Sequence, residues 1–516
     1  MAATRIAVVA LVMVVGAGFL ARLAPPIVTT ADIAVTELYT DLASHGQLLV
    51  GPYSRFEWHH PGPLYFYLLA PGYVAAGRAG AALYAEAVVI NVAAAALLLA
   101  TMLLVRRPSI AVTTGIVCLA FALRADGVVA SPWTAHIVVL PALALLGLCA
   151  SVADGSANLL PAAAVVATFL AQTDLALGPP TAAIVLLALG ATAIRSGRAR
   201  TVPYKELAIA GALSAVLWIP TILEAARHRG GNLGNLWRFF GGASGGAHTM
   251  REAVACWSYG FVGIARSDFG LPWGGHIDVA SAQWATPAAV ALVIALGICL
   301  VVAVRNRQSF EAWLAAVILA AALASLWGLT RVRKDILDHE IFWLVALGAL
   351  TAGFVVLAAI RTLLPKALTG RRADRWFIQA SVALVGGLTI VGAVQARDFI
   401  GKDERSALGH DVVPAALAID SYLEGAHARA ALIEVEASAW AQAVPIILRL
   451  RQHHRRVAVS PANVFMFTDA LAPTGREDAW LKITAAGQSP DDGASVVFDS
   501  YRVVVVAEPG RFPGLR

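Results

Sequence analysis

The feature that most constrains this chain is a series of long apolar runs with no charged residue inside them. Three examples are Ala87 to Val105, Ala288 to Val304 and Ile341 to Ile360. About 20 apolar residues are what a helix needs to cross the hydrocarbon core of a bilayer. Inside that core every backbone amide must be paired within the chain, so such runs form helices. The chain is therefore predicted to be a polytopic membrane protein.

The composition supports this prediction. Of the 516 residues, 59% are hydrophobic and only 14% are charged, whereas soluble domains have about 45–50% and about 25%. The net charge of +6 is spread along the flanks of the apolar runs and is not gathered into one patch. That distribution is typical of membrane topology and excludes nucleic acid as a partner.

Length and flanking charge predict about eleven crossings in an all-α membrane domain. The first is expected to be an uncleaved helix, because Arg22 disturbs the place where a signal peptidase needs small residues. The expected crossings are Ile6–Leu23, Ala81–Val105, Ile110–Leu123, Ile137–Val152, Leu159–Leu177, Thr181–Ile194, Leu207–Leu223, Ala288–Val304, Phe310–Trp327, Ile341–Ile360 and Phe377–Val394.

Lys and Arg predict the orientation, because short cytoplasmic turns are enriched in both. With the N-terminus in the cytoplasm, four basic turns lie inside, around Arg106, Arg198, Arg305 and Arg371. The opposite face then holds the loops 24–80, 224–287 and 328–340 and the tail after residue 396. Several basic residues on that face break the rule. We attribute the following ones to function: Arg55, Arg227, Arg229, Arg238, Arg331, Arg333 and Lys334.

The tail is different in character, which divides the chain into a membrane domain, 1–396, and a small extracytoplasmic α/β domain, 397–516. Short β-branched runs alternate with an amphipathic helix at Ala437–Gln452. The expected strands are Ala431–Val435, Val457–Ser460, Val496–Phe498 and Arg502–Val506. The glycine-rich stretch 230–246 lacks the Lys-Ser/Thr ending of a phosphate loop, and we expect a flexible loop there.

The most informative segment is the first outside loop. It combines carboxylates, histidines, an arginine and aromatic residues between Asp32 and Tyr67. Pro61 and Pro63 prevent one continuous helix, so a separate helix should begin near Leu64. The aromatic residues of that helix suit the membrane surface.

This pattern resembles the GT-C glycosyltransferases, nearest to the protein O-mannosyltransferases and the bacterial aminoarabinose transferases of lipid A. The resemblance is carried by Asp32 after the first helix, by Tyr39-Thr40-Asp41-Leu42-Ala43-Ser44-His45-Gly46 and by the turn His60-Pro61-Gly62-Pro63-Leu64-Tyr65. It extends to Ser131-Pro132-Trp133-Thr134-Ala135-His136, to Phe169–Asp174 and to Gly231–Phe240. It implies an inverting hexosyl or pentosyl transferase in the bacterial inner membrane. Such an enzyme moves a sugar from a polyprenyl-phosphate donor to an envelope glycan, lipid or protein.

The resemblance also implies that Asp32 is the catalytic carboxylate. The family often has Asp-Glu at this point, but this chain has Asp32-Ile33. A second catalytic carboxylate would therefore be Glu37 or Asp41, which share one face of a helix because they are four residues apart. The alternatives are that Asp32 caps that helix and that the other two carboxylates lie on a solvated face.

The chemistry needs a base for the acceptor hydroxyl and fixed cations for the leaving phosphate. Arg331, Arg333 and Lys334 are predicted to hold the donor phosphate, with Arg55 as a weaker candidate, since arginine presents forked donors. The alternative is snorkelling to lipid headgroups. The donor has a good leaving group, so no cofactor is required, and a divalent metal is not expected.

Five residues are predicted to bind substrate: Trp58, His59, His60, Tyr65 and Asp174. A carboxylate at the depth of Asp174 in a membrane is costly enough to indicate a task, although it could instead pair with Arg124. The histidines could equally hold the loop by hydrogen bonds, and the tryptophan could anchor it at the membrane surface.

Two other classes of function are open. A transporter or lipid flippase would show paired ionisable groups or broken helices near mid-bilayer in symmetric halves, and the sequence shows no such halves. A catalytically inactive scaffold is the other alternative. The enzyme hypothesis expects Asp32 and the cationic trio Arg331, Arg333 and Lys334 to open onto one cavity at the outer face.

Overall fold

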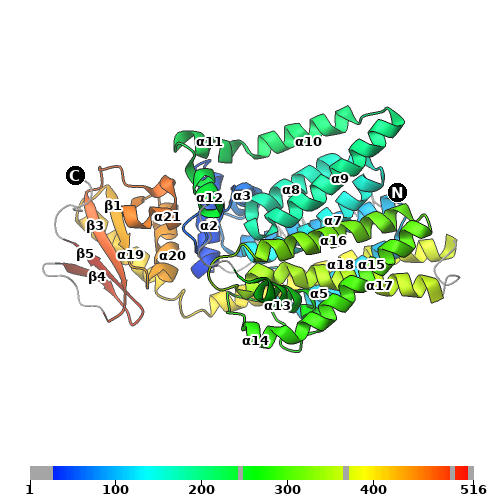
Figure 1. The fold of residues 1–516 in the computed structure, drawn as a ribbon. Coiled ribbons are helices and arrows are strands. Elements are labelled where there is room, and N and C mark those ends of the chain that lie inside the picture. Colours follow the sequence, from blue (N-terminus) through cyan, green and yellow to red (C-terminus); the bar gives the residue numbers. More distant parts are fainter. Residues whose placement is uncertain (1–26, 242–247, 364–370, 488–493, 509–516) are drawn as a thin grey trace. The chain divides into compact units, whose positions relative to one another are not determined.

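The computed structural model describes residues 27–241, 248–363, 371–487 and 494–508. This part of the chain forms two compact units (Figure 1). We call His60–Leu64 together with Ala85–Ala396 the membrane unit. We call residues 27–59, 65–84 and 397–508 the loop-and-tail unit, because it combines the first loop with the C-terminal tail.

Seven helices among the described residues are long and apolar enough to cross a membrane. They confirm the prediction of a polytopic membrane fold, and each coincides with a predicted crossing. They are α4 (Ala81–Leu104), α7 (Val139–Asp154, extended at its start by α6, Thr134–Ile137), α9 (Gly178–Ala199), α15 (Thr286–Arg305), α16 (Ser309–Leu329), α17 (Phe342–Leu363) and α18 (Arg371–Glu404).

The other predicted crossings differ from these in length or shape. The crossing at 207–223 is a pair of helices, α10 (Tyr204–Leu217) and α11 (Ile219–Arg227), bent by 47°. The bend has a local cause, since Pro220 has no N–H to continue the helical ladder. Two further helices, α5 (Pro108–Arg124) and α8 (Leu160–Thr173), are apolar but shorter than the seven. The first predicted crossing, Ile6–Leu23, lies outside the described residues.

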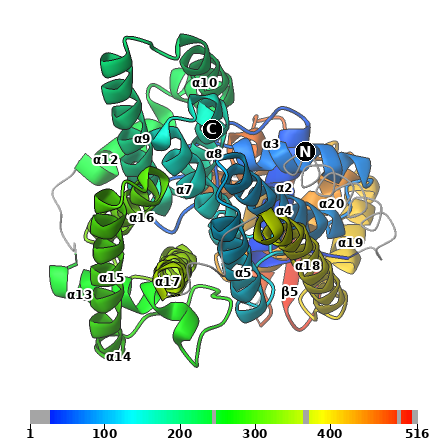
Figure 2. The same cartoon turned by 90° about the vertical axis from the view of Figure 1, so that its right-hand side faces the viewer.

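The core of the membrane unit is α7. Every residue from Val139 to Ala153 is buried, and α7 packs against α8, α9, α16 and α17 (Figure 2). A helix that is apolar on all sides can be surrounded by lipid or by other helices, and α7 is surrounded by other helices. The long hydrophobic runs of the sequence therefore include one inner helix as well as helices that face lipid.

The described part of the glycine-rich segment, 230–241, does not form the flexible loop that we predicted, and residues 242–246 lie outside the described residues. Residues Gly231–Gly241 form helix α12. Its first turn is capped from outside, because the Glu224 carboxylate accepts hydrogen bonds from the Asn232 N–H at 3.0 and 3.1 Å. Leu236 is buried. External capping and packing thus offset the low helix propensity of glycine. Helices α13 (Met250–Phe261) and α14 (Val279–Ala282) follow.

The loop-and-tail unit is a mixed α/β structure. Its sheet has the strand order β2-β1-β3-β5-β4. Strands β2, β1 and β3 are parallel to one another, and β5 is antiparallel to both of its neighbours, β3 and β4. The strands are β1 (Ala430–Val435), β2 (Arg456–Val459), β3 (Ala479–Ala485), β4 (Ser495–Asp499) and β5 (Val503–Ala507). The α/β prediction for the tail is confirmed, but β3 was missed, because Lys482 and Thr484 interrupt its apolar run.

The helices of this unit come from both ends of the chain. The first loop contributes α2 (Ala31–Ser44) and α3 (Leu64–Ala75), and the tail contributes α19 (Val412–Gly425) and α20 (Trp440–Gln452). Helix α20 packs against both α19 and α2. Its apolar face, including Val444, Ile447 and Leu448, is buried. The first loop and the tail are therefore parts of one folded unit.

Candidate active-site residues

Asp32 lies in the first turn of α2. The N-cap is Thr30, so Asp32 is the second helical residue and does not cap the helix as we considered. Its half-buried carboxylate accepts a hydrogen bond from the Tyr53 hydroxyl. An anionic group is favoured in a first turn because the unpaired N–H groups there carry partial positive charge. The helix end and the tyrosine together orient one carboxylate.

Tyr53 belongs to a small hairpin that also carries three predicted site residues, Arg55, Trp58 and His59. It forms a β-bridge with His59, and the turn between them places the Arg55 guanidinium 4.6 Å from the centre of the Phe56 ring. Phe56 in turn stacks on Trp58 at 5.9 Å. Burial and the adjacent Asp32 charge raise the pKa of Tyr53. The Tyr53 hydroxyl therefore stays protonated at neutral pH and acts as a donor.

Glu37 lies one helical turn further along α2 and is 5% exposed. Its carboxylate accepts hydrogen bonds from Thr29 Oγ1 at 2.5 Å and from the Tyr73 hydroxyl at 3.0 Å. A Cβ atom at Gly80 would come within 2.8 Å of Glu37 Oε2. Burial raises the pKa of Glu37 to about 7, although both hydrogen bonds oppose the shift. Glu37 thus connects α2 to α3 and to the turn after α3.

Asp41 is 3% exposed and is paired with two arginines. Arg78 Nη1 lies 2.7 Å from Asp41 Oδ1, and Arg451 Nη2 lies 3.4 Å from Asp41 Oδ2. Glu37 and Asp41 share one face of α2, as their spacing predicts, but that face is buried within the unit and is not a solvated one.

His59 and Tyr65 are buried in the same unit. His59 Nε2 is 3.4 Å from the Tyr39 hydroxyl, and its ring lies 4.8 Å from that of Phe465. The Tyr39 hydroxyl donates to the Met466 carbonyl oxygen at 2.8 Å. Burial lowers the pKa of His59 to about 4, so the imidazole is neutral at physiological pH. The ring of Tyr65, fully buried, packs against Phe66 at 5.3 Å.

His60 and its proline turn belong to the membrane unit. The Leu175 N–H donates to His60 Nδ1 at 2.8 Å, and the Leu64 N–H donates to Gln172 Oε1 at 3.2 Å. A Cβ atom at Gly62 would come within 2.3 Å of Gln172 Oε1, so a larger residue there would displace the Gln172 side chain from this contact. His60 thus accepts a hydrogen bond that holds the loop, and its predicted contact with substrate stays a prediction.

Asp174 lies beside this turn. Its carboxylate accepts a hydrogen bond from the Ala176 N–H at 2.9 Å and caps the short helix η2 (Leu175–Leu177). Arg124, considered as a partner for Asp174, instead donates to the Arg266 carbonyl oxygen at 2.6 Å. The structure thus brings two predicted substrate-binding residues, His60 and Asp174, next to each other.

The cationic trio lies in the membrane unit, between α16 and α17. Arg333 places its guanidinium 4.3 Å from the Phe239 ring centre and also donates to the Phe239 carbonyl oxygen. Arg331 is exposed and lies 5.2 Å from the Trp327 ring centre. Lys334 is exposed, and its carbonyl oxygen accepts a hydrogen bond from His248 at 2.7 Å. Arg333 thus supports α12, while the other two side chains face outward.

One aromatic cluster of the membrane unit was not predicted as a site. Trp133 stacks on Trp273 at 5.4 Å with an interplanar angle of 13°, and the His339 ring lies 5.0 Å from Trp133. Asp338 accepts a hydrogen bond from the Gly274 N–H at 3.0 Å. These residues come from three distant segments, so spacing along the sequence offers no signal for the cluster.

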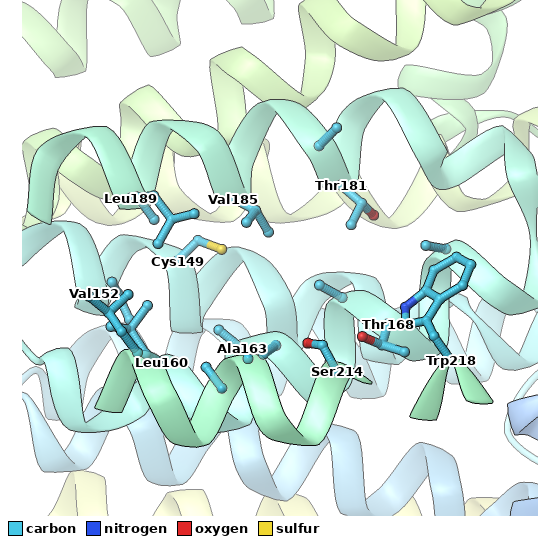
Figure 3. Close-up of a pocket in the computed structure, with 18 of the residues that line it drawn as sticks. Cys149, Val152, Leu160, Ala163, Thr168, Thr181, Val185, Leu189, Ser214 and Trp218 are labelled. Atoms are coloured by element: carbon cyan, nitrogen blue, oxygen red, sulfur yellow. The ribbon is translucent and has the colours of Figure 1, made fainter. Parts of the chain in front are cut away.

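The membrane unit also contains an apolar pocket of about 450 Å³ between α7, α8, α9 and α10 (Figure 3). None of its lining residues is charged. Thr168, Ser214 and Trp218 lie toward one end, and Val152 and Leu160 toward the other. Alanine and glycine form much of its wall, and this is why nothing in the sequence distinguished it from ordinary helix packing.

No group of three or more His, Cys, Asp or Glu side chains in the described part of the chain is arranged to hold a metal ion. The predicted site residues fall into two groups. Asp32, Glu37, Asp41, Arg55, Trp58, His59 and Tyr65 belong to the loop-and-tail unit, and His60, Asp174, Arg331, Arg333 and Lys334 belong to the membrane unit. The roles of these residues in catalysis and binding stay predictions.

Comparisons with known proteins show a likeness in fold. No family model matches the sequence, and no curated protein matches it. Among solved structures, the chain is similar to ArnT from Cupriavidus metallidurans bound to undecaprenyl phosphate. The TM-score is 0.53 at 14% identity, and the match covers 99% of this chain and 98% of that one. The chain has an ArnT-like fold.

Proposed function

We propose that this protein is a membrane glycosyltransferase that moves a sugar from a polyprenyl-phosphate donor to an envelope acceptor. The observation that carries the proposal is the ArnT-like fold over 99% of the chain. Within that fold Asp32 follows the first predicted crossing, as the family resemblance expects. The ArnT structure was solved with undecaprenyl phosphate, and that ligand supports the same donor class here.

In the proposed reaction Asp32 acts as the general base. Its carboxylate takes the proton of the acceptor hydroxyl while the hydroxyl oxygen forms a bond to the anomeric carbon. The bond from that carbon to the phosphate oxygen breaks, and polyprenyl phosphate leaves with the electron pair. A base of this kind contributes about 10²- to 10⁴-fold to the rate. Tyr53 is a positioning residue, because its hydroxyl orients the carboxylate.

Glu37 and Asp41 have a different role in this proposal. Both are buried and accept hydrogen bonds from residues of the same unit, so we assign them to holding α2 in place. Asp32 is left as the half-buried carboxylate of the three.

The membrane unit contains features that suit a lipid-linked donor. Its uncharged pocket is of a size that ligand sites commonly have, and hydrocarbon is the chemistry that matches its lining. We assign the donor's isoprenoid chain to this pocket. Arg331 and Lys334, which are exposed, are assigned to the donor phosphate, where fixed cations stabilise the developing negative charge.

The test is transfer by the purified full-length protein with synthetic polyprenyl-phosphate pentose and hexose donors and envelope extracts as acceptors. Mass analysis should detect both sugar-modified acceptor and released polyprenyl phosphate. Asp32→Asn should lower the rate by about 100-fold or more, while Asp499→Asn, an exposed position in the same unit, should not. Full activity of a folded Asp32→Asn protein would remove Asp32 from the mechanism. Movement of intact donor across vesicles without bond cleavage would favour a flippase.

A further inference from the structure

Helices α11 and α12, residues 219–241, form a hairpin of the membrane unit that the proposed reaction does not use. We call it the basic hairpin. Its inner side is firmly held: Glu224 accepts from the Asn232 N–H, and a Cβ atom at Gly231 would come within 2.3 Å of the Glu224 carboxylate. The Asn232 side chain donates to the His60 carbonyl oxygen at 3.4 Å. These contacts fix the backbone of the hairpin and therefore the side chains that its outward side exposes.

The outward side of the basic hairpin is apolar over most of its length. On α11, Ile222 is 56% exposed and Leu223 is 44% exposed, and on α12, Trp237 is 81% exposed and Phe240 is 51% exposed. Trp237 and Phe240 are three residues apart and share a helix face. Because α11 continues the bent apolar helix pair that begins with α10, we place this face at the edge of the hydrocarbon layer.

The exposed charged residues of the hairpin are all basic. Arg227, Arg229 and Arg238 are exposed, and the sequence from 225 to 241 contains no Asp or Glu. Glu224 is buried on the inner side. Arg238 donates to Asn235 Oδ1 at 2.5 Å, one turn earlier in the same helix, so this guanidinium is not tied down by a carboxylate.

The spacing of apolar and basic residues matches the layers of a bilayer surface. Leu223 and Arg227 are one helical turn apart, which is about 6 Å along the axis. The polar headgroup layer on each side of the hydrocarbon core is about 5–7 Å thick. When Ile222 and Leu223 contact acyl chains, Arg227 and Arg229 therefore reach the depth of the lipid phosphates.

We infer that the basic hairpin is a docking surface for anionic phospholipid headgroups. The apolar side chains contact the acyl chains, and the three arginines donate to the phosphate, for which the guanidinium fork is well suited. Lipids with net negative charge are preferred, because in a zwitterionic lipid the ammonium group offsets the phosphate. This inference does not depend on the proposed glycosyl transfer.

The experiment compares lipids retained by the full-length protein after exchange into an equimolar mixture of phosphatidylglycerol and phosphatidylcholine. Each arginine near an anionic surface changes the binding constant by about fivefold. Phosphatidylglycerol enrichment should therefore be at least tenfold lower than in the wild type when all three arginines are replaced (Arg227→Gln, Arg229→Gln, Arg238→Gln). The triple Arg→Lys variant should keep most of it. Equal enrichment in the Gln variant and the wild type would overturn the inference.

Two controls separate this surface from other phosphate sites. Arg331→Gln with Lys334→Gln, which changes the proposed donor-phosphate residues, should leave phosphatidylglycerol enrichment unchanged. Loss of enrichment in that variant alone would overturn the assignment to the hairpin. Inorganic phosphate should not displace the lipid at millimolar concentration, because it lacks acyl chains, and displacement would mark a free-phosphate site instead. If the triple Gln variant fails to fold, Arg227→Gln alone should show about a fivefold loss.

Discussion

The two compact units treat charged side chains in different ways. In the membrane unit, the buried Glu311 lies near the start of α16 and pairs with Arg361 near the end of α17 at 2.9 Å, and the buried Glu224 of α11 caps the first turn of α12. The central helix α7 has no charged residue from Val139 to Ala153. In the loop-and-tail unit, by contrast, Glu37 and Asp41 lie inside the unit on the buried face of α2.

The difference shows what each unit relies on for stability. The membrane unit is held by helices whose apolar surfaces match one another, and its charges only fix the ends. The loop-and-tail unit is assembled from separate segments, and its carboxylates hold those segments together. Removing a carboxylate from the buried face of α2 should therefore lower the unfolding free energy much more than removing one from an exposed position of the same unit.

The largest effect is expected for Asp41→Ala. It leaves Arg78 and Arg451 without their shared partner, and breaking a buried ion pair costs about 3 kcal/mol of unfolding free energy. The measurement is thermal unfolding in detergent, followed by a probe in the loop-and-tail unit. Glu424→Gln is the matched control, because Glu424 is 70% exposed beside Arg455 and such pairs contribute about 1 kcal/mol or less. Equal losses in both variants would contradict the comparison.

Glu37→Gln should change how stability depends on pH. The folded-state pKa of Glu37 is about 7, above its ordinary value of 4.5, so the folded state binds the proton more tightly than the unfolded state. The unfolding free energy contributed by Glu37 is then fully present below pH 4.5 and falls by up to about 3 kcal/mol as pH rises to 7. The melting temperature of Glu37→Gln relative to the wild type should increase between pH 5 and 7.5. A difference that does not vary with pH would show that Glu37 is not held protonated.

Gln172→Ala tests the membrane unit at one of its few buried polar contacts. The side chain accepts from the Leu64 N–H and donates to the Leu217 carbonyl oxygen at 2.9 Å. Leaving those two backbone groups unpaired should cost about 2 kcal/mol. Gln283→Ala, an exposed glutamine bonded to Arg251, is the control and should change the melting temperature little. A small effect of Gln172→Ala would mean that the proline turn is held by its shape alone.

The smallest effect is expected for Tyr53→Phe. It removes the hydroxyl that orients Asp32 and leaves the ring in place. Transfer should slow by about tenfold, the equivalent of one hydrogen bond of about 1.4 kcal/mol, with the loss in kcat and not in the KM for the donor. Tyr67→Phe, which removes a hydroxyl that donates to the Leu48 carbonyl oxygen, should not slow transfer. Equal rates for Tyr53→Phe and the wild type would leave Asp32 without a positioning partner.

Hydropathy was sufficient to predict the membrane unit, because burial in lipid depends on local composition. It also counted α5 and α8 as crossings, although both are shorter than the seven long apolar helices. It took the glycines of α12 for a loop because the cap is supplied by Glu224. Helical spacing correctly placed Glu37 and Asp41 on one face. It could not show what that face touches, since Arg451 is 410 residues away from Asp41. Likewise, nothing in the sequence near Asp32 identifies Tyr53 as its partner.

The hydrogen bond from Tyr39 to Met466 joins residues 427 positions apart. During synthesis the first loop therefore leaves the ribosome long before the residues that complete its packing exist. Until α20 and the segment around Met466 are translated, Asp41 lacks Arg451 and the buried face of α2 has no cover. A message truncated between residue 404, where α18 ends, and that point would yield a protein with all its long apolar helices and with the packing of its first loop incomplete. Loss of the last hundred residues should thus be as damaging as loss of the first loop itself.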